Sequence, residues 1–305
     1  MKRLSIGILL FSAALAATAS APEECRIEPA RALSWTQFAS LKPEVEPPST
    51  AIYAGCGKRL VYVAAVHSNE ANGKTFVAVR QAFERHRPHH VLLEGFPSSM
   101  GVNPAPLIEH SAKVMGTPGD AEPYLSVRIA HSRGVSFSGG EPNDSDILAS
   151  VRAKGMSAGD LFAIYVLRQI EQWVRETRIA SHRDPALDDL IRDYARSFVT
   201  DAKVEIADIA AVSTFAGFRN WYASVNGLDF MQNYRAEDAW PVTPATNRPT
   251  NKLIVSISDA REAHILGEIS KALSRHRIVL VVYGASHHDI QAPALQAALG
   301  KPTRD

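Results

Sequence analysis

The chain has few cysteines, little net charge and no long apolar segment beyond its N-terminus. Two of its 305 residues are cysteine, and 33 basic residues nearly balance 32 acidic ones. Because no basic run or basic-aromatic interleaving occurs, nothing indicates a nucleic-acid partner. After the first 21 residues no segment is apolar over the length of a bilayer, so no membrane span is expected. The 46% hydrophobic and 21% charged content is typical of a globular protein.

Residues 1–21 have the layout of a secretory signal peptide. Lys2 and Arg3 precede an apolar run that ends at Leu15, and small residues follow it, with cleavage expected after Ala19. The run is too short for a stable membrane anchor. The sequence therefore predicts an exported protein, periplasmic or secreted.

Both cysteines, Cys25 and Cys56, lie in a proline-rich stretch ahead of the first strong strand pattern. Export to an oxidising compartment favours a disulfide between them, which would add roughly 3 to 4 kcal/mol of stability in the chain-entropy model. Residues 22–57 show little periodicity, and we expect an irregular arm there.

Apolar runs predict an α/β fold with a largely parallel central sheet flanked by helices. A helical pattern over 73–86 lies between the first two runs, as in a βαβ unit. We expect a single domain over 58–305, with a helical insertion at about 144–240, a helix beginning at Asp259 and a closing helix over 291–299. The expected strands are 60–66, 91–93, 135–138 and 278–283.

Ionisable side chains follow the ends of these strands. Carboxyl ends of parallel strands meet at one sheet edge, where ligands bind in open α/β folds. A helix that precedes a parallel strand begins at the same edge, so the helix expected from Asp259 would bring Arg261 and His264 there. The four strand-end residues are His67, Glu94, Glu141 and His287.

These residue types suit two kinds of chemistry. Two histidines and two carboxylates could bind a divalent ion such as Mn, Co or Zn. The same groups could act as general acids and bases, with Arg261 stabilising an oxyanion. We take His67 and His287 as candidate metal ligands, and the candidate catalytic residues are Glu94, Glu141, Arg261 and His264. The expected substrate is a small molecule or a peptide.

This layout resembles the TraB/GumN–Tiki family, which is related to haem-binding ChaN proteins and erythromycin esterases. The motifs are Val-Leu-Leu-Glu94-Gly, Gly-Gly-Glu141-Pro, Asp-Ala-Arg261-Glu-Ala-His264 and Gly284-Ala-Ser-His287. The resemblance implies hydrolysis, metal-assisted as in Tiki-type proteases or by acid/base chemistry as in the esterases. It equally implies a non-enzymatic binder of haem or metal of the ChaN type.

One motif departs from the family pattern. The sequence Ala64-Ala-Val-His67 has alanine where the family usually has glycine. This departure puts the equivalence of the two histidine half-sites in question, and a degenerate, inactive relative is a third possibility. Two other motifs are incomplete: Gly73-Lys74-Thr75 lacks the first glycine of a P-loop, and Gly284-Ala-Ser286 lacks the closing glycine of a nucleophile elbow.

Overall fold

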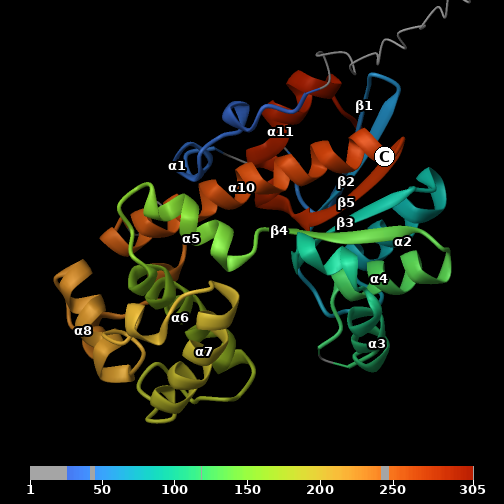
Figure 1. Ribbon diagram of the computed structural model, residues 1–305. Coiled ribbons are helices and arrows are strands. Elements are labelled where there is room, and N and C mark those ends of the chain that lie inside the picture. Colours follow the sequence, from blue (N-terminus) through green and yellow to red (C-terminus); the bar gives the residue numbers. More distant parts are fainter. Residues whose placement is uncertain (1–25, 42–44, 118, 242–246, 305) are drawn as a thin grey trace, which may run out of the picture.

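The computed structural model describes residues 26–41, 45–117, 119–241 and 247–304. Its strands form a six-stranded sheet in the order β4-β3-β5-β2-β1-β6 (Figure 1). The pairs β2–β5, β3–β5 and β3–β4 are parallel, whereas β1 is antiparallel to β2 and β6. The expected α/β fold with a largely parallel sheet is confirmed. The strands are β1 Ser49–Gly55, β2 Lys58–Ala65, β3 His90–Pro97, β4 Ser136–Glu141, β5 Ile278–Gly284 and β6 Thr303–Arg304.

The central strands β2 and β5 read as continuous apolar runs because both sheet faces are covered. Val61 and Val63 of β2 pack on one face, and Leu60 and Tyr62 pack on the other. Helices α2 Lys74–His86, α3 Ala105–Lys113 and α4 Glu122–Ser132 supply the core of the first face, whereas α10 Pro249–Arg275 and α11 Ala285–Leu299 supply that of the second (Figure 1).

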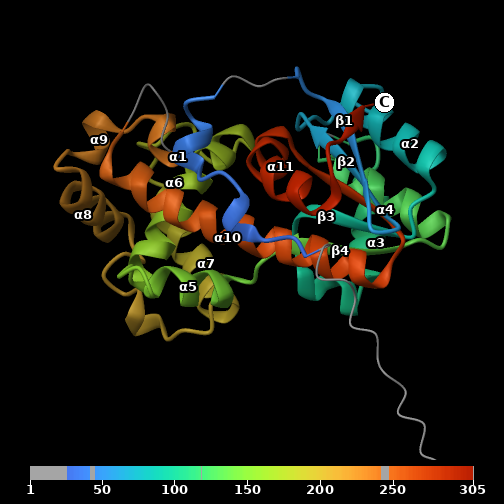
Figure 2. The ribbon, with the colours of Figure 1, turned by 90° about the horizontal axis from the view of Figure 1, so that it is seen from above.

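The expected helical insertion lies beside the sheet, beyond β4, and has its own apolar core (Figures 1 and 2). Ile254 and Ile257 of α10 belong to this core, whereas Ile265 and Ile269 of the same helix pack on the sheet. Helix α10 therefore joins the two parts. None of the helices within the described ranges is both long and apolar enough to cross a membrane. The insertion contains α5 Asp144–Arg152, α6 Ala158–Arg175, α7 Leu187–Asp201, α8 Phe215–Asn226 and α9 Phe230–Asn233.

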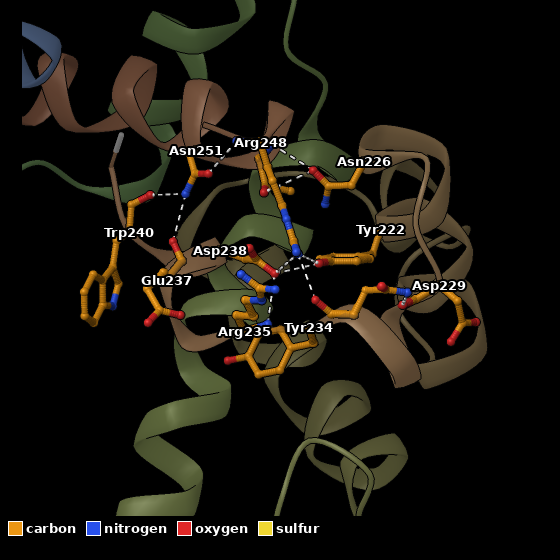
Figure 3. A network of polar contacts seen from close by, with 12 residues as sticks. Tyr222, Asn226, Asp229, Tyr234, Arg235, Glu237, Asp238, Trp240, Arg248 and Asn251 are labelled. Carbon is orange, nitrogen blue, oxygen red and sulfur yellow. Dashed lines mark hydrogen bonds and ion pairs between the residues drawn. The ribbon is translucent and has the colours of Figure 1, made fainter. Parts of the chain in front are cut away.

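A buried polar network fixes the start of α10 against the insertion (Figure 3). Arg248 forms an ion pair with the fully buried Asp238 and donates to the Tyr222 hydroxyl at 2.6 Å. Asn251 closes a capping box with Arg248 and donates to two backbone carbonyls at 2.8 Å. The helix thus begins at Pro249, ten residues before Asp259, and our prediction of a start at Asp259 is wrong.

The N-terminal arm is more ordered than we predicted. Residues 49–55 form β1, which pairs with β2 over its whole length, and α1 (Trp35–Phe38) begins with a capping box at Ser34. The expectation of an irregular arm over 22–57 is therefore wrong for these two parts. The predicted signal peptide and Cys25 lie outside the described residues, so export and the Cys25–Cys56 disulfide stay predictions.

Candidate functional site

His287 lies in the first turn of α11, directly beyond the end of β5. Its side chain is 6% exposed, and its Nδ1 atom lies 2.5 Å from a carboxylate oxygen of Glu262. The other Glu262 oxygen accepts a 2.7 Å hydrogen bond from Gln291, which in turn accepts from the Tyr62 hydroxyl at 3.1 Å. An ionised carboxylate only accepts, so Nδ1 of His287 carries the proton. The ring therefore presents Nε2 to the sheet edge.

His67 follows β2 and is the exposed half of the site. Its Nδ1 atom lies 2.5 Å from the buried carboxylate of Glu122 in the first turn of α4, and 64% of its side chain is exposed. The Thr75 hydroxyl contacts both the amide (3.2 Å) and the carbonyl (2.7 Å) of Val66, which fixes the loop ahead of His67. Thr75 of the P-loop-like sequence thus has a structural role.

Glu94 lies between the two imidazoles. One of its oxygens is 3.4 Å from Nε2 of His287, and the other is 3.7 Å from Nε2 of His67. The second oxygen also accepts a 2.6 Å hydrogen bond from the amide of Gly284. The register of β3 shifts after Leu93, and Gly95 has a φ of +82°, so the chain turns at this point. Three strand ends therefore meet at one carboxylate.

The glycine at position 284 is required by this close approach. A Cβ atom there would lie 3.2 Å from Nε2 of His67 and 3.4 Å from a carboxylate oxygen of Glu94. Ala64, by contrast, is buried within regular β2 and pairs with Tyr283. An alanine methyl is therefore compatible with the backbone before His67, and the departure from the family pattern does not displace this histidine.

Glu141 and Arg261 form a second unit beside the first. Arg261 donates from Nε and Nη2 to the two oxygens of Glu141, both at 2.8 Å. The side chain of Glu141 is 14% exposed and that of Arg261 is 16% exposed. The charge of Arg261 also acts on Glu94. This bidentate geometry fixes the guanidinium plane. No hydrogen bond within the described ranges engages Nη1 of Arg261.

No hydrogen bond or ion pair in the described part of the chain joins His264 to this site. Its Nε2 atom is buried and has no hydrogen-bond partner among the described residues. The prediction placed His264 at the rim because the helix was expected to begin at Asp259. In the structure this position lies in the middle of α10, and Arg261 reaches the site because the helix passes over the sheet edge.

The electrostatics of the cluster follow from its buried carboxylates. Burial disfavours a charged His287, but the charge and hydrogen bond of Glu262, together with Glu94, raise the pKa of His287 to about 9. Burial disfavours a charged Glu94, yet the hydrogen bond and charge of His287 lower its pKa to about 2. The hydrogen bond that Nδ1 of His67 donates to Glu122 raises the pKa of His67. At neutral pH His287 is therefore an imidazolium between two carboxylates.

The carboxylates that hold the histidines were missed in the sequence. Glu262 follows Asp259 by three residues, which is the spacing of a capping box, and this local pattern suggests a helix start instead of a site residue. Glu122 follows Ala121 and precedes Pro123 at the start of the helix before β4. The rule that a helix before a parallel strand begins at the carboxyl edge holds for this helix, so it could have identified Glu122.

The cluster shares one feature with the divalent-ion sites that the sequence suggested. Histidines that bind metals present one ring nitrogen to the ion while the other donates to a carboxylate. His67 and His287 each have Nδ1 on a carboxylate, and Glu94 lies between their Nε2 atoms, of which that of His287 would lose its proton on binding an ion. Within the described ranges, however, no group of three or more His, Cys, Asp or Glu side chains has the spacing of a formed metal site.

Comparisons of the chain with protein-family models, curated proteins and solved structures found no match.

Proposed function

We propose that this protein hydrolyses ester or amide bonds at the cluster of His67, Glu94 and His287, as a member of the TraB/GumN–Tiki group. The observation that carries the proposal is the orientation of the two imidazoles. Buried carboxylates hold Nδ1 of each ring at 2.5 Å, so both Nε2 atoms face Glu94. Buried titratable groups with perturbed pKa values and specific charged partners cluster at functional sites.

His67 is suited to act as the general base. It is the exposed member of the cluster, and Glu122 keeps the proton on Nδ1, so the neutral ring has a free Nε2. This nitrogen accepts a proton from water as the water attacks the carbonyl carbon, and returns it to the leaving group. The Glu122 hydrogen bond also stabilises the imidazolium that forms.

Two cationic groups are suited to stabilise the negative charge that develops on the carbonyl oxygen. His287 carries a proton at neutral pH, and Arg261 has Nη1 directed away from its bonds to Glu141. Preorganised charges of this kind contribute strongly to catalysis in sites shielded from water. Glu141 is the residue that positions Arg261.

A divalent ion is the alternative source of activated water at this cluster. His67, His287 and Glu94 would hold it, and when bound it would lower the pKa of a coordinated water. In that case Glu122 and Glu262 orient the ligands, as carboxylates do in the outer shell of metal sites.

The test is hydrolysis of a panel of 4-nitrophenyl esters and fluorogenic peptides, together with elemental analysis of the protein as purified. We expect turnover by the wild type and a loss of about 100-fold or more in His67→Ala, the size of a general-base or ligand contribution. His131→Ala, an exposed histidine on α4, should match the wild type. Equal turnover in His67→Ala and His131→Ala would contradict the proposal.

A second candidate function is the binding of haem or a metal ion without turnover. The exposure of the His67 side chain favours it, because an accessible imidazole can serve as an axial ligand. Addition of haem would then produce a Soret band that is lost in His67→Ala. Identical spectra of the two proteins would contradict haem binding through His67.

A further inference from the structure

A cavity of about 670 Å³ lies between the carboxyl edge of the sheet and the helical insertion. Gly95, Glu141 and Arg261 form the end next to the histidine cluster. Helix α6 forms the facing wall with a row of polar side chains. Glu94 precedes Gly95, and Arg261 acts on it electrostatically, so this end of the cavity is next to the proposed catalytic cluster, although the three cluster residues do not line it. The α6 residues that line it are Tyr165, Arg168, Gln169, Gln172 and Arg175.

Two arginines of this wall have no anionic partner among the described residues. Arg168 and Arg175 are seven residues apart on α6, which places them on one face of the helix. Neither makes a hydrogen bond or an ion pair to another part of the chain that the structure describes. Arg261, across the same cavity, is bound by both oxygens of Glu141. The insertion therefore contributes cations that its own fold leaves unpaired.

Arg168 is the member nearer to the catalytic end. The positive charge of Arg261 acts directly on it, and burial among the cavity walls and this charge both lower the pKa of Arg168. The side chain is open to the cavity, although the surrounding walls reduce its contact with bulk water. The guanidinium is therefore accessible to an anion that enters the cavity.

The acidic residues of the cavity do not supply that anion. Asp144 accepts a 3.1 Å hydrogen bond from the Tyr165 hydroxyl, and burial and the charge of Asp201 raise its pKa. Neither aspartate forms an ion pair with Arg168 or Arg175 in the described part of the chain. Glu141, the third carboxylate of the cavity, has both oxygens bound by Arg261, so its charge reaches Arg168 only through space.

We propose that Arg168 binds an anionic group, a carboxylate or a phosphate, on the molecule that enters this cavity. The planar guanidinium suits bidentate binding of either group. If the proposed hydrolysis holds, the substrate is an ester or amide with such a group on one side of the bond. The anion then lies at Arg168 while the bond reaches the histidine cluster.

The binding test needs no turnover. Succinate and inorganic phosphate are titrated separately into the full-length protein by calorimetry, at low salt. We expect at least one of the two to bind, with an affinity that falls roughly tenfold or more in Arg168→Gln, as for the loss of a charge-assisted pair. Arg168→Lys keeps the positive charge but lacks the planar guanidinium, so its affinity should lie between those of the wild type and Arg168→Gln. Arg152→Gln, an exposed α5 arginine that does not line the cavity, should bind as the wild type does.

Kinetics separate a failure of this proposal from a failure of the proposed hydrolysis. 4-Nitrophenyl acetate is compared with the hemisuccinate, which differs by a carboxylate. Arg168→Gln should raise KM for the hemisuccinate alone. Absence of binding of both anions, or equal binding by wild type and Arg168→Gln, would overturn the role of Arg168. Normal anion binding without hydrolysis of any ester or peptide would instead overturn the hydrolase and leave the anion site in place.

Discussion

Nδ1 of His287 lies 2.5 Å from the carboxylate of Glu262, and this contact joins two helices on the same face of the sheet. Gln291 holds the other oxygen of Glu262, so the carboxylate cannot turn away. The contact fixes the orientation of the ring and keeps it charged. The following predictions depend on such contacts, each between the cluster and the elements that position it.

Glu262→Gln should lower turnover by changing the charge and orientation of His287 without unfolding the protein. The amide preserves shape but removes the charge that holds the imidazolium, so we expect turnover to fall by about tenfold or more. The pH profile should also shift, because the pKa of His287 would fall. Glu268→Gln, a substitution on the same helix outside the cluster, serves as the control. An unchanged pH profile in Glu262→Gln would contradict this role.

The His287 ion pair also predicts a dependence of stability on pH. The pKa of His287 rises from its usual 6.5 to about 9 in the folded protein. The stabilisation is therefore fully present below pH 6.5 and is lost as the pH rises through 9. Urea unfolding in the presence of EDTA should show a steeper loss of stability over this window in the wild type than in Glu262→Gln. Parallel curves for the two proteins would contradict the pair.

Gly284→Ala should impair the site without unfolding the protein. The backbone there has φ −53° and ψ 145°, which alanine can adopt, but its Cβ would lie 3.2 Å from Nε2 of His67. His67 is exposed and would move, and a misplacement of this kind costs about 10- to 100-fold in rate. Gly267→Ala is the control, since nothing lies within 4 Å of its added methyl on α10. A fully active Gly284→Ala would contradict the close approach.

The buried pair at the start of α10 predicts a large effect on stability. Arg248→Met leaves the carboxylate of Asp238 buried without its cation, which should cost about 3 kcal/mol or more. The free energy of unfolding from urea titration measures this loss. Arg152→Met, at an exposed position, should change it by less than about 0.5 kcal/mol. A loss as small as that of the control would show that the network does not fix this helix.

Much of the sheet could be predicted from the sequence, but only part of the site could. The apolar runs that became β2 and β5 are unambiguous because both faces of these strands are buried. Strand β1 was missed, since it lies near the sheet edge and its sequence, Ser-Thr-Ala-Ile-Tyr-Ala-Gly, lacks a long apolar run. It forms a hairpin with β2 across the two-residue turn Cys56-Gly57, whose sequence lacks the Asn-Gly or Asp-Gly typical of such turns.

At the site, strand-end geometry brought His67, Glu94, Glu141 and His287 to one edge, as expected. The same reasoning misplaced His264, because Asp259 and Glu262 imitate a helix start in the middle of a 27-residue helix. The true start depends on Arg248 and Asp238, which meet only in the folded protein. Glu262 and Glu122 hold histidines that are 25 and 55 residues away in the chain. The helix-start rule marks the position of Glu122, but no local pattern pairs either carboxylate with its histidine.

The most direct test of the account is kcat/KM of Glu94→Gln for the best substrate of the ester and peptide panel. Glutamine keeps the size of the side chain and an acceptor for the Gly284 amide, but removes the charge between the two imidazoles. We predict a fall of about 100-fold or more in a protein with an unchanged circular dichroism spectrum. A value of kcat/KM equal to that of the wild type would contradict a catalytic role for the cluster.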